Sequence, residues 1–139
     1  MNDYEKKALA FHKAFDGIFD QPLSVPLLEL RKALLSEEMR ELFAEVDRAI
    51  ADIQETGAVT PGTCAAMLKE MADVQYVLSG TSAVFGLPMQ QVFDRVHDSN
   101  MSKLGADGKP ILRADGKILK GPNYRPPDLS DLAESISTE

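Results

Sequence analysis

The sequence predicts an all-α, four-helix-bundle-like fold with an irregular C-terminal arm, and three observations support this prediction. Apolar residues recur at alternating spacings of three and four along most of the chain, which is typical of the buried side of a helix. Aromatic residues make up only 6% of the chain and Trp is absent, so the core must consist of Leu, Val, Ile, Met and Ala. These residues favour helices over a β-sandwich. Glycine and proline separate the periodic segments at positions where helices typically end and begin.

Four main helices and one short helix are expected, each bounded by such signals. Gly17, Gly57 and Gly86 stand where three helices should end, because glycine readily adopts the left-handed conformation found after a helix C-terminus. Thr60-Pro61 is a start signal that combines an N-cap residue with proline at the first helical position. The helices are therefore expected at about residues 3–17, 26–56, 61–86, 88–103 and from 128 onwards.

Length and composition exclude several classes of protein. The chain has 139 residues, which suits a single domain at 1–139, with a helical core at 3–103 and a substrate-covering arm at 104–127. The formal net charge of −7 argues against sequence-independent binding to nucleic acid. No signal peptide and no run of 18 apolar residues are recognisable, so we expect a cytoplasmic protein without a membrane span. The single cysteine, Cys64, is compatible with a reducing compartment.

Five acidic residues on two neighbouring helices are the most informative feature of the sequence. The second expected helix carries Glu37, Glu38 and Glu41, and the third carries Glu70 and Asp73. Residues three or four apart share a helix face, and four of these acids, Glu37, Glu41, Glu70 and Asp73, lie in rows that are otherwise apolar or small. Such rows normally face a neighbouring helix, where an unpaired carboxylate is strongly penalised. Because Mg²⁺ prefers carboxylate oxygens, the pattern predicts a magnesium site between the two helices.

Other interpretations of the acids stay open at this point. Glu45 and Asp47 are expected to be ordinary surface acids, and the five acids above could likewise be the solvated face of a non-catalytic helical interaction module. A di-iron carboxylate bundle is a further alternative. That chemistry usually requires Glu-x-x-His motifs, and neither His12 nor His97 lies three residues after a glutamate, which counts against it.

The order of the acids also matches a known motif. The sequence resembles the signature of the all-α nucleoside triphosphate pyrophosphohydrolases in its two acidic pairs, Glu38-x-x-Glu41 and Glu70-x-x-Asp73. That superfamily includes the MazG-like proteins, the phosphoribosyl-ATP pyrophosphohydrolases and the dimeric dUTPases. The resemblance covers about residues 30–128. Within this range, Asn100-x-x-Lys103 is similar to an Asn/Lys pair of the family, and residues 114–128 are similar to the C-terminal arm of MazG-like relatives. Because 139 residues are too few for the tandem domains of full-length MazG, a single such domain is expected.

The resemblance implies an activity and a set of cofactors. Members cleave (deoxy)nucleoside triphosphates to the monophosphate and pyrophosphate, for nucleotide pool sanitation or, in phage-encoded members, for dNTP pool remodelling. The two acidic pairs would hold Mg²⁺, or Mn²⁺ as a substitute, and Glu37 would orient or deprotonate the attacking water. The family also associates with itself, so a homodimer or a dimer-of-dimers tetramer is expected, with the nucleotide as the only other partner.

The expected substrate-binding residues have side chains that can contact a phosphate, a sugar or a base. They are His12, Asn100, Lys103, Arg113, Lys117, Lys120 and Tyr124. For any one of the cations, ordinary solubility is an equally good explanation. Tyr124 is expected either to stack on a base or to contact a neighbouring subunit. The resemblance implies that His12 lines the base pocket beside Phe11, as the corresponding helix does in relatives, but an ordinary surface position explains His12 equally well. The sequence does not identify which nucleotide base is recognised.

Overall fold

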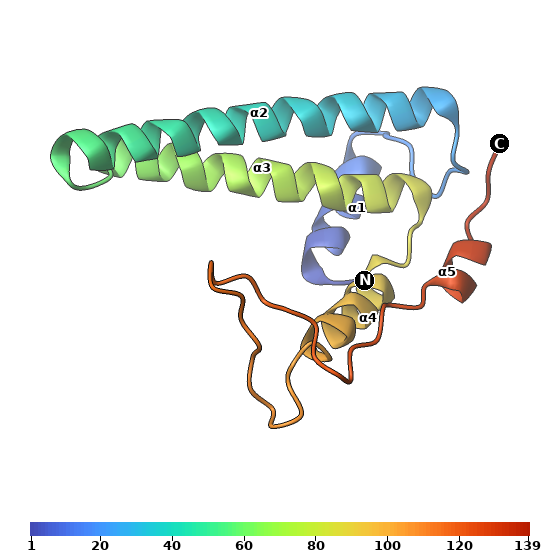
Figure 1. The fold of residues 1–139 in the computed structure, drawn as a ribbon. Helices are drawn as coiled ribbons and strands as arrows, with labels where there is room; N and C mark the ends of the chain where they lie inside the picture. Colours follow the sequence, from blue (N-terminus) through green and yellow to red (C-terminus); the bar gives the residue numbers. More distant parts are fainter. The chain divides into compact units, whose positions relative to one another are not determined.

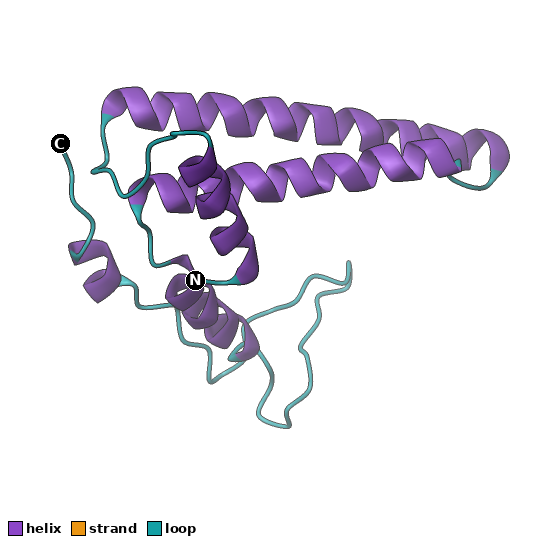
Figure 2. Ribbon diagram, turned by 180° about the vertical axis from the view of Figure 1, so that it is seen from behind, coloured by secondary structure: helices purple, strands orange, loops and turns teal.

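The computed structural model describes all 139 residues and consists of helices joined by loops, without any strand (Figures 1 and 2). The five helices are α1 (Asp3–Ala14), α2 (Val25–Thr56), α3 (Pro61–Phe85), α4 (Met89–Met101) and α5 (Ser130–Glu134). They belong to two compact units, the first formed by Met1–Leu87 with Ser137–Glu139 and the second by Pro88–Ile136. The all-α prediction is confirmed. No helix is both long enough and apolar enough to cross a membrane.

The helix ends follow the signals in the sequence. Gly57 and Gly86 adopt the left-handed conformation after α2 and α3, with φ of 82° and 60°. The Thr60 side chain accepts a hydrogen bond from the Thr63 N–H, which satisfies a free donor in the first turn of α3. Helix α1 ends three residues before the expected Gly17, because Asp16 already has a positive φ of 51°.

In the first unit, α2 and α3 form a long antiparallel hairpin, and α1 packs against α3 (Figure 1). The core of this unit lies where α1 meets the end of α3, and Ala8 and Val84 are each only 1% exposed there. Glu5 is buried at the same place. Its two carboxylate oxygens accept hydrogen bonds from the Ser82 hydroxyl and from the Asn2 N–H, both at 2.8 Å, so its burial is compensated. The C-terminal residues complete this unit through Leu23, whose N–H donates to the Ser137 carbonyl at 2.9 Å.

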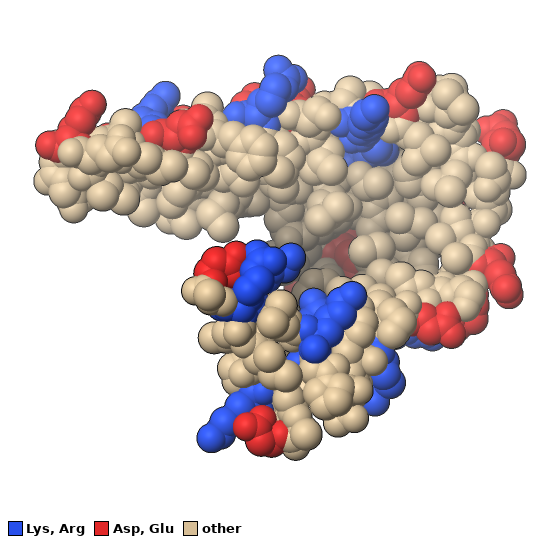
Figure 3. Space-filling model, viewed as in Figure 1, with Lys and Arg blue, Asp and Glu red and all other residues tan.

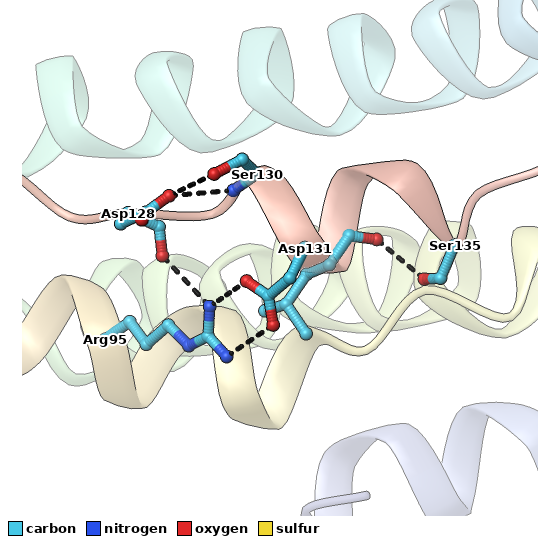
Figure 4. A network of polar contacts seen from close by, with 6 residues as sticks. Arg95, Asp128, Ser130, Asp131 and Ser135 are labelled. Atoms are coloured by element: carbon cyan, nitrogen blue, oxygen red, sulfur yellow. Dashed lines mark hydrogen bonds and ion pairs between the residues drawn. The ribbon is translucent and has the colours of Figure 1, made fainter.

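In the second unit, the segment that follows α4 is held to that helix at several points. Arg95 of α4 forms an ion pair with Asp131 of α5 and donates to the Asp128 carbonyl at 3.0 Å (Figure 4). The Ser99 hydroxyl donates to the Arg125 carbonyl at 2.7 Å. The backbone N–H of Gly121 donates to the Lys103 carbonyl at 2.9 Å.

The arm contains a short hairpin that the sequence analysis did not predict. Leu112 and Ile118 form an antiparallel bridge, and the Arg113 N–H donates to the Lys117 carbonyl at 2.8 Å. Gly116, with φ of 85°, provides the left-handed residue that a tight hairpin connection requires. The Asp115-Gly116 pair was the available signal, since Asp-Gly between strands is typical of a hairpin turn.

A candidate metal centre on helices α2 and α3

Three carboxylates from two helices converge halfway along the hairpin of α2 and α3. Glu38 and Glu41 are three residues apart on α2, and Glu70 lies opposite on α3. One oxygen from each of these three residues lies within 4.8 Å of the other two. The two helices thus bring together acids that are about thirty positions apart in the chain.

The environment of these carboxylates fits a divalent cation. Glu38 Oε2 and Glu70 Oε2 are both buried and have no hydrogen-bond partner. Burial and then the charges of Glu41, Asp73 and Glu70 raise the pKa of Glu38, and only Lys69 opposes them. A buried carboxylate oxygen without a donor is costly. Mg²⁺ and Mn²⁺ take carboxylate oxygens as ligands, so the residues present fit such an ion.

Asp73 lies beside the trio and is held by a lysine. Lys69 Nζ lies 2.6 Å from Asp73 Oδ2 and 3.4 Å from Glu70 Oε1. Hydrogen bonds to Asp73 and then Glu70 raise the pKa of Lys69. The lysine side chain is 64% exposed, so it can move away without disturbing the core. Sequence reasoning did not single out Lys69, although its spacing of four from Asp73 was visible.

The buried row of α2 differs from the one expected. The prediction placed Glu37 and Glu41 in the row that faces a neighbouring helix, but both are exposed, whereas Glu38 is half-buried. Glu45, expected to be a surface acid, is also half-buried. Its side chain is 15% exposed, and its Oε2 has no partner while Arg48 pairs with its other oxygen at 3.3 Å. The row that faces α3 is therefore polar at intervals of seven, at Arg31, Glu38, Glu45 and Asp52.

Comparison with known proteins agrees with this arrangement. The sequence profile of the family described as phosphoribosyl-ATP pyrophosphohydrolase matches residues 10–100, which include all four acids of the motif. The chain belongs to the phosphoribosyl-ATP pyrophosphohydrolase family. The resemblance seen in the sequence to this group of all-α pyrophosphohydrolases is thereby confirmed.

A solved structure also matches the chain. The crystal structure of a candidate NTP pyrophosphohydrolase from Exiguobacterium sp. 255-15 matches with 23% sequence identity and a TM-score of 0.46, over 96% of this chain and 93% of that one. A search of curated protein sequences finds no significant match.

The other residues predicted for the site lie in both units of this pyrophosphohydrolase family member. Glu37 is exposed on α2 and is outside the trio, and His12 is half-buried on α1. The second unit contains the rest, namely Asn100, Lys103, Arg113, Lys117, Lys120 and Tyr124. Within that unit, Lys120 Nζ lies 4.7 Å from the centre of the Tyr124 ring, and Arg113 pairs with Asp115. Their roles toward a substrate stay predictions.

Proposed function

We propose that this protein is a divalent-metal-dependent pyrophosphohydrolase that converts (deoxy)nucleoside triphosphates to the monophosphate and pyrophosphate. The observation that carries the proposal is the convergence of Glu38, Glu41 and Glu70, with two buried oxygens that lack any donor. Without a bound cation, the negative charge of these carboxylates would repel the negative charge of a triphosphate. The family supports the same reaction class, since its profile describes a pyrophosphohydrolase.

Glu38, Glu41, Glu70 and Asp73 are the residues that would hold Mg²⁺ or Mn²⁺. When bound, the ion supplies charge neutralisation for the phosphates and lowers the pKa of water. Asp73 could bind the ion after the Lys69 side chain moves away from it. The exposed Lys69 ammonium could then pair with solvent or with a phosphate oxygen. Glu37, exposed on the same helix, would accept a proton from the water that attacks the α-phosphorus.

The second unit would contribute substrate contacts. Lys103, Lys117, Lys120 and Arg113 can pair with phosphate oxygens, and Asn100 with the sugar. Residues 104–127 would then cover the nucleotide and exclude water from it. In the cell, such an activity would serve nucleotide pool sanitation or dNTP pool remodelling.

Self-association is part of the proposal. Leu68, Met71 and Leu78 form an apolar stripe along α3, and these side chains are 58%, 52% and 48% exposed in the single chain. In Figure 3 charged side chains gather along α2, while the adjoining surface of the hairpin is nearly free of them. An exposed apolar stripe of this length is typical of a protein–protein interface. We infer a homodimer or a dimer of dimers, and light scattering at micromolar concentration tests it, with a monomer as the contradicting result.

Release of pyrophosphate from a panel of nucleoside triphosphates, with and without Mg²⁺, tests the catalytic proposal. Glu38→Gln and Glu70→Gln should each abolish nearly all turnover and leave the helical circular dichroism unchanged. Asp47→Asn is the matched control, because Asp47 is an exposed acid on α2 outside the cluster. Absence of any metal-dependent pyrophosphate release would instead favour the non-catalytic helical interaction module.

A further inference from the structure

Lys69 on α3 is the only lysine or arginine within ion-pair distance of the four acids of the motif. Its Nζ lies 2.6 Å from Asp73 Oδ2 and 3.4 Å from Glu70 Oε1. The ammonium thus provides one positive charge beside four carboxylates, and it leaves Glu38 Oε2 and Glu70 Oε2 buried without a partner. Lys69 therefore neutralises only part of the site, on the side of Asp73 and Glu70.

Asp73 differs from the other acids of the motif in its position relative to them. Oxygens of Glu38, Glu41 and Glu70 lie within 4.8 Å of one another. Asp73 is outside this trio, and it is the acid that Lys69 approaches most closely. A carboxylate oxygen that binds Mg²⁺ lies about 2.0–2.1 Å from the ion, so an ion at this oxygen and the Lys69 ammonium would repel each other at close range. An ion that uses Asp73 must therefore displace Lys69 from it.

Lys69 can leave Asp73 at little cost in free energy. The two residues are four apart on α3 with the lysine nearer the N-terminus, which is the weaker orientation for an ion pair within a helix. The Lys69 side chain is 64% exposed and that of Asp73 35%, and ion pairs open to water contribute little to stability. The flexible four-carbon stem of a lysine also lets its ammonium move without a change in the helix. A ligand with a stronger negative charge can therefore take the ammonium from Asp73.

A triphosphate is a ligand of this kind. A lysine ammonium has three N–H donors, and it binds phosphate oxygens as a point charge. A triphosphate bound through an ion at the trio would bring phosphate oxygens next to Lys69, because Lys69 lies beside Glu70. When the ammonium moves from the two carboxylates to a phosphate oxygen, Asp73 becomes free for a metal ion. Binding of the triphosphate and binding of metal at Asp73 then favour each other.

We propose that Lys69 is a substrate-binding residue that exchanges Asp73 and Glu70 for a phosphate oxygen of the bound triphosphate, so that metal and triphosphate bind cooperatively. This inference rests on the proposed function. Because coupling between two ligands is reciprocal, the triphosphate should strengthen metal binding by the same factor by which the metal strengthens triphosphate binding. A permanent phosphate contact or an ordinary surface ion pair would affect only one of the two ligands.

Metal binding without nucleotide provides the first test. Lys69→Gln keeps a polar side chain at this exposed position and removes the charge that competes for Asp73. We expect calorimetry with Mg²⁺ alone to give a Kd about three- to five-fold lower for Lys69→Gln than for the unmodified protein. Lys32→Gln is the matched control, because Lys32 is an exposed lysine on α2 without an acidic partner. Its Kd for Mg²⁺ should stay within about two-fold of the unmodified value.

Triphosphate binding provides the second test, and its change should have the opposite sign. The probes are the α,β-methylene analogues of dATP, dCTP, dGTP and dUTP, which cannot be hydrolysed between the α- and β-phosphorus, titrated in excess Mg²⁺. The Kd of the tightest-binding analogue should rise about ten-fold or more in Lys69→Gln, because a hydrogen bond between charged groups is lost. Lys32→Gln should leave this Kd unchanged. Lys69→Arg keeps the positive charge and should lie between Lys69→Gln and the unmodified protein in both tests.

Opposite changes in the two dissociation constants support the exchange, and three results contradict it. Weaker binding of both ligands by Lys69→Gln would indicate a structural role. An unchanged Mg²⁺ affinity with weaker analogue binding would make Lys69 a simple phosphate contact. Unchanged or tighter analogue binding would make Lys69 only the ion-pair partner of Asp73.

The proposed function and the exchange at Lys69 fail in different ways. If no triphosphate is hydrolysed, the proposed function is wrong, and the two dissociation constants still test Lys69 because neither measurement requires turnover. If the unmodified protein binds no Mg²⁺ or none of the analogues, the exchange is refuted as well. If triphosphates are hydrolysed but the two constants do not change in opposite directions, only the inference about Lys69 is wrong.

Discussion

Replacement of Glu38 by glutamine should stabilise the protein when no divalent metal is present. Burial and the charges of Glu41, Asp73 and Glu70 raise the pKa of Glu38, so the folded chain binds this proton more tightly than the unfolded chain. Stability must then fall as the pH rises above the ordinary value of 4.5 and through the raised pKa of the folded state. Above the raised pKa of the folded state the full cost is present, and the neutral amide removes it.

The size of the effect follows from the distances within the trio. Two unit charges 4.8 Å apart repel each other by about 3 kcal/mol at an effective dielectric constant of 20 and by about 1 kcal/mol in bulk water. Because Glu38 is only half-buried, and Lys69 offsets part of the charge, we expect a gain of about 1–2 kcal/mol in the free energy of unfolding. For a domain of this size that corresponds to a rise of about 3–8 °C in Tm.

Thermal unfolding followed by circular dichroism, first with EDTA and then with increasing Mg²⁺, measures both effects. As Mg²⁺ is added, the Tm of the unmodified protein should rise until it exceeds the Tm of Glu38→Gln. The Tm of the variant should respond only weakly to the metal. Asp47→Asn removes one negative charge from the same helix and should change neither value by more than about 1 °C. The reasoning is refuted if Glu38→Gln has a lower Tm than the unmodified protein in EDTA, or if it keeps the full response to Mg²⁺.

Three further predictions concern other parts of the molecule. Glu37→Gln should lower kcat by about a hundred-fold or more while the Mg²⁺ affinity measured by calorimetry persists, and a collapse of that affinity would make Glu37 a ligand. Burial and then Arg31 lower the pKa of His12, so urea unfolding should show stability falling as the pH drops below 6.5, and His12→Gln should flatten this dependence. A side chain at Gly121 would lie 2.3 Å from the Leu104 carbonyl oxygen, so Gly121→Ala should expose residues 105–120 to limited proteolysis, whereas Gly62→Ala should have no such effect.

The helices were predictable because their signals are local. A left-handed glycine such as Gly57 or Gly86 and an N-cap such as Thr60 act on their own turn, so the sequence places these ends within a few residues. The four-acid motif was predictable for a related reason. A spacing of three on a helix fixes a shared face, and the family match over residues 10–100 supports the same two helices.

The rotation of α2 toward α3 was not predictable in the same way. Both Glu37 and Glu38 lie in rows with apolar neighbours. Which of the two is buried depends on how α3 packs against α2. That packing includes contacts between residues fifty positions apart, such as Arg31 with Thr81. The pairing of Lys69 with Asp73 and the bridge in the arm were missed because each depends on one specific contact between side chains or backbones. The hydrophobic periodicity of the sequence contains no information about such single contacts.

The polar row of α2 shows how the architecture relates to a ligand. At the closed end of the hairpin, Asp52 accepts hydrogen bonds from the backbone and hydroxyl of Thr60, so its charge is satisfied by the protein itself. Two turns away Glu45 shares its charge with Arg48. Glu38, the next member, has a buried Oε2 without any hydrogen-bond partner, whereas Arg31, the last, donates to the Thr81 hydroxyl and the Val77 carbonyl. Since burying an unpaired charge destabilises a fold, retaining Glu38 at a helix interface is understandable if a bound cation satisfies it. The divalent metal ion that we propose at Glu38, Glu41 and Glu70 is such a cation.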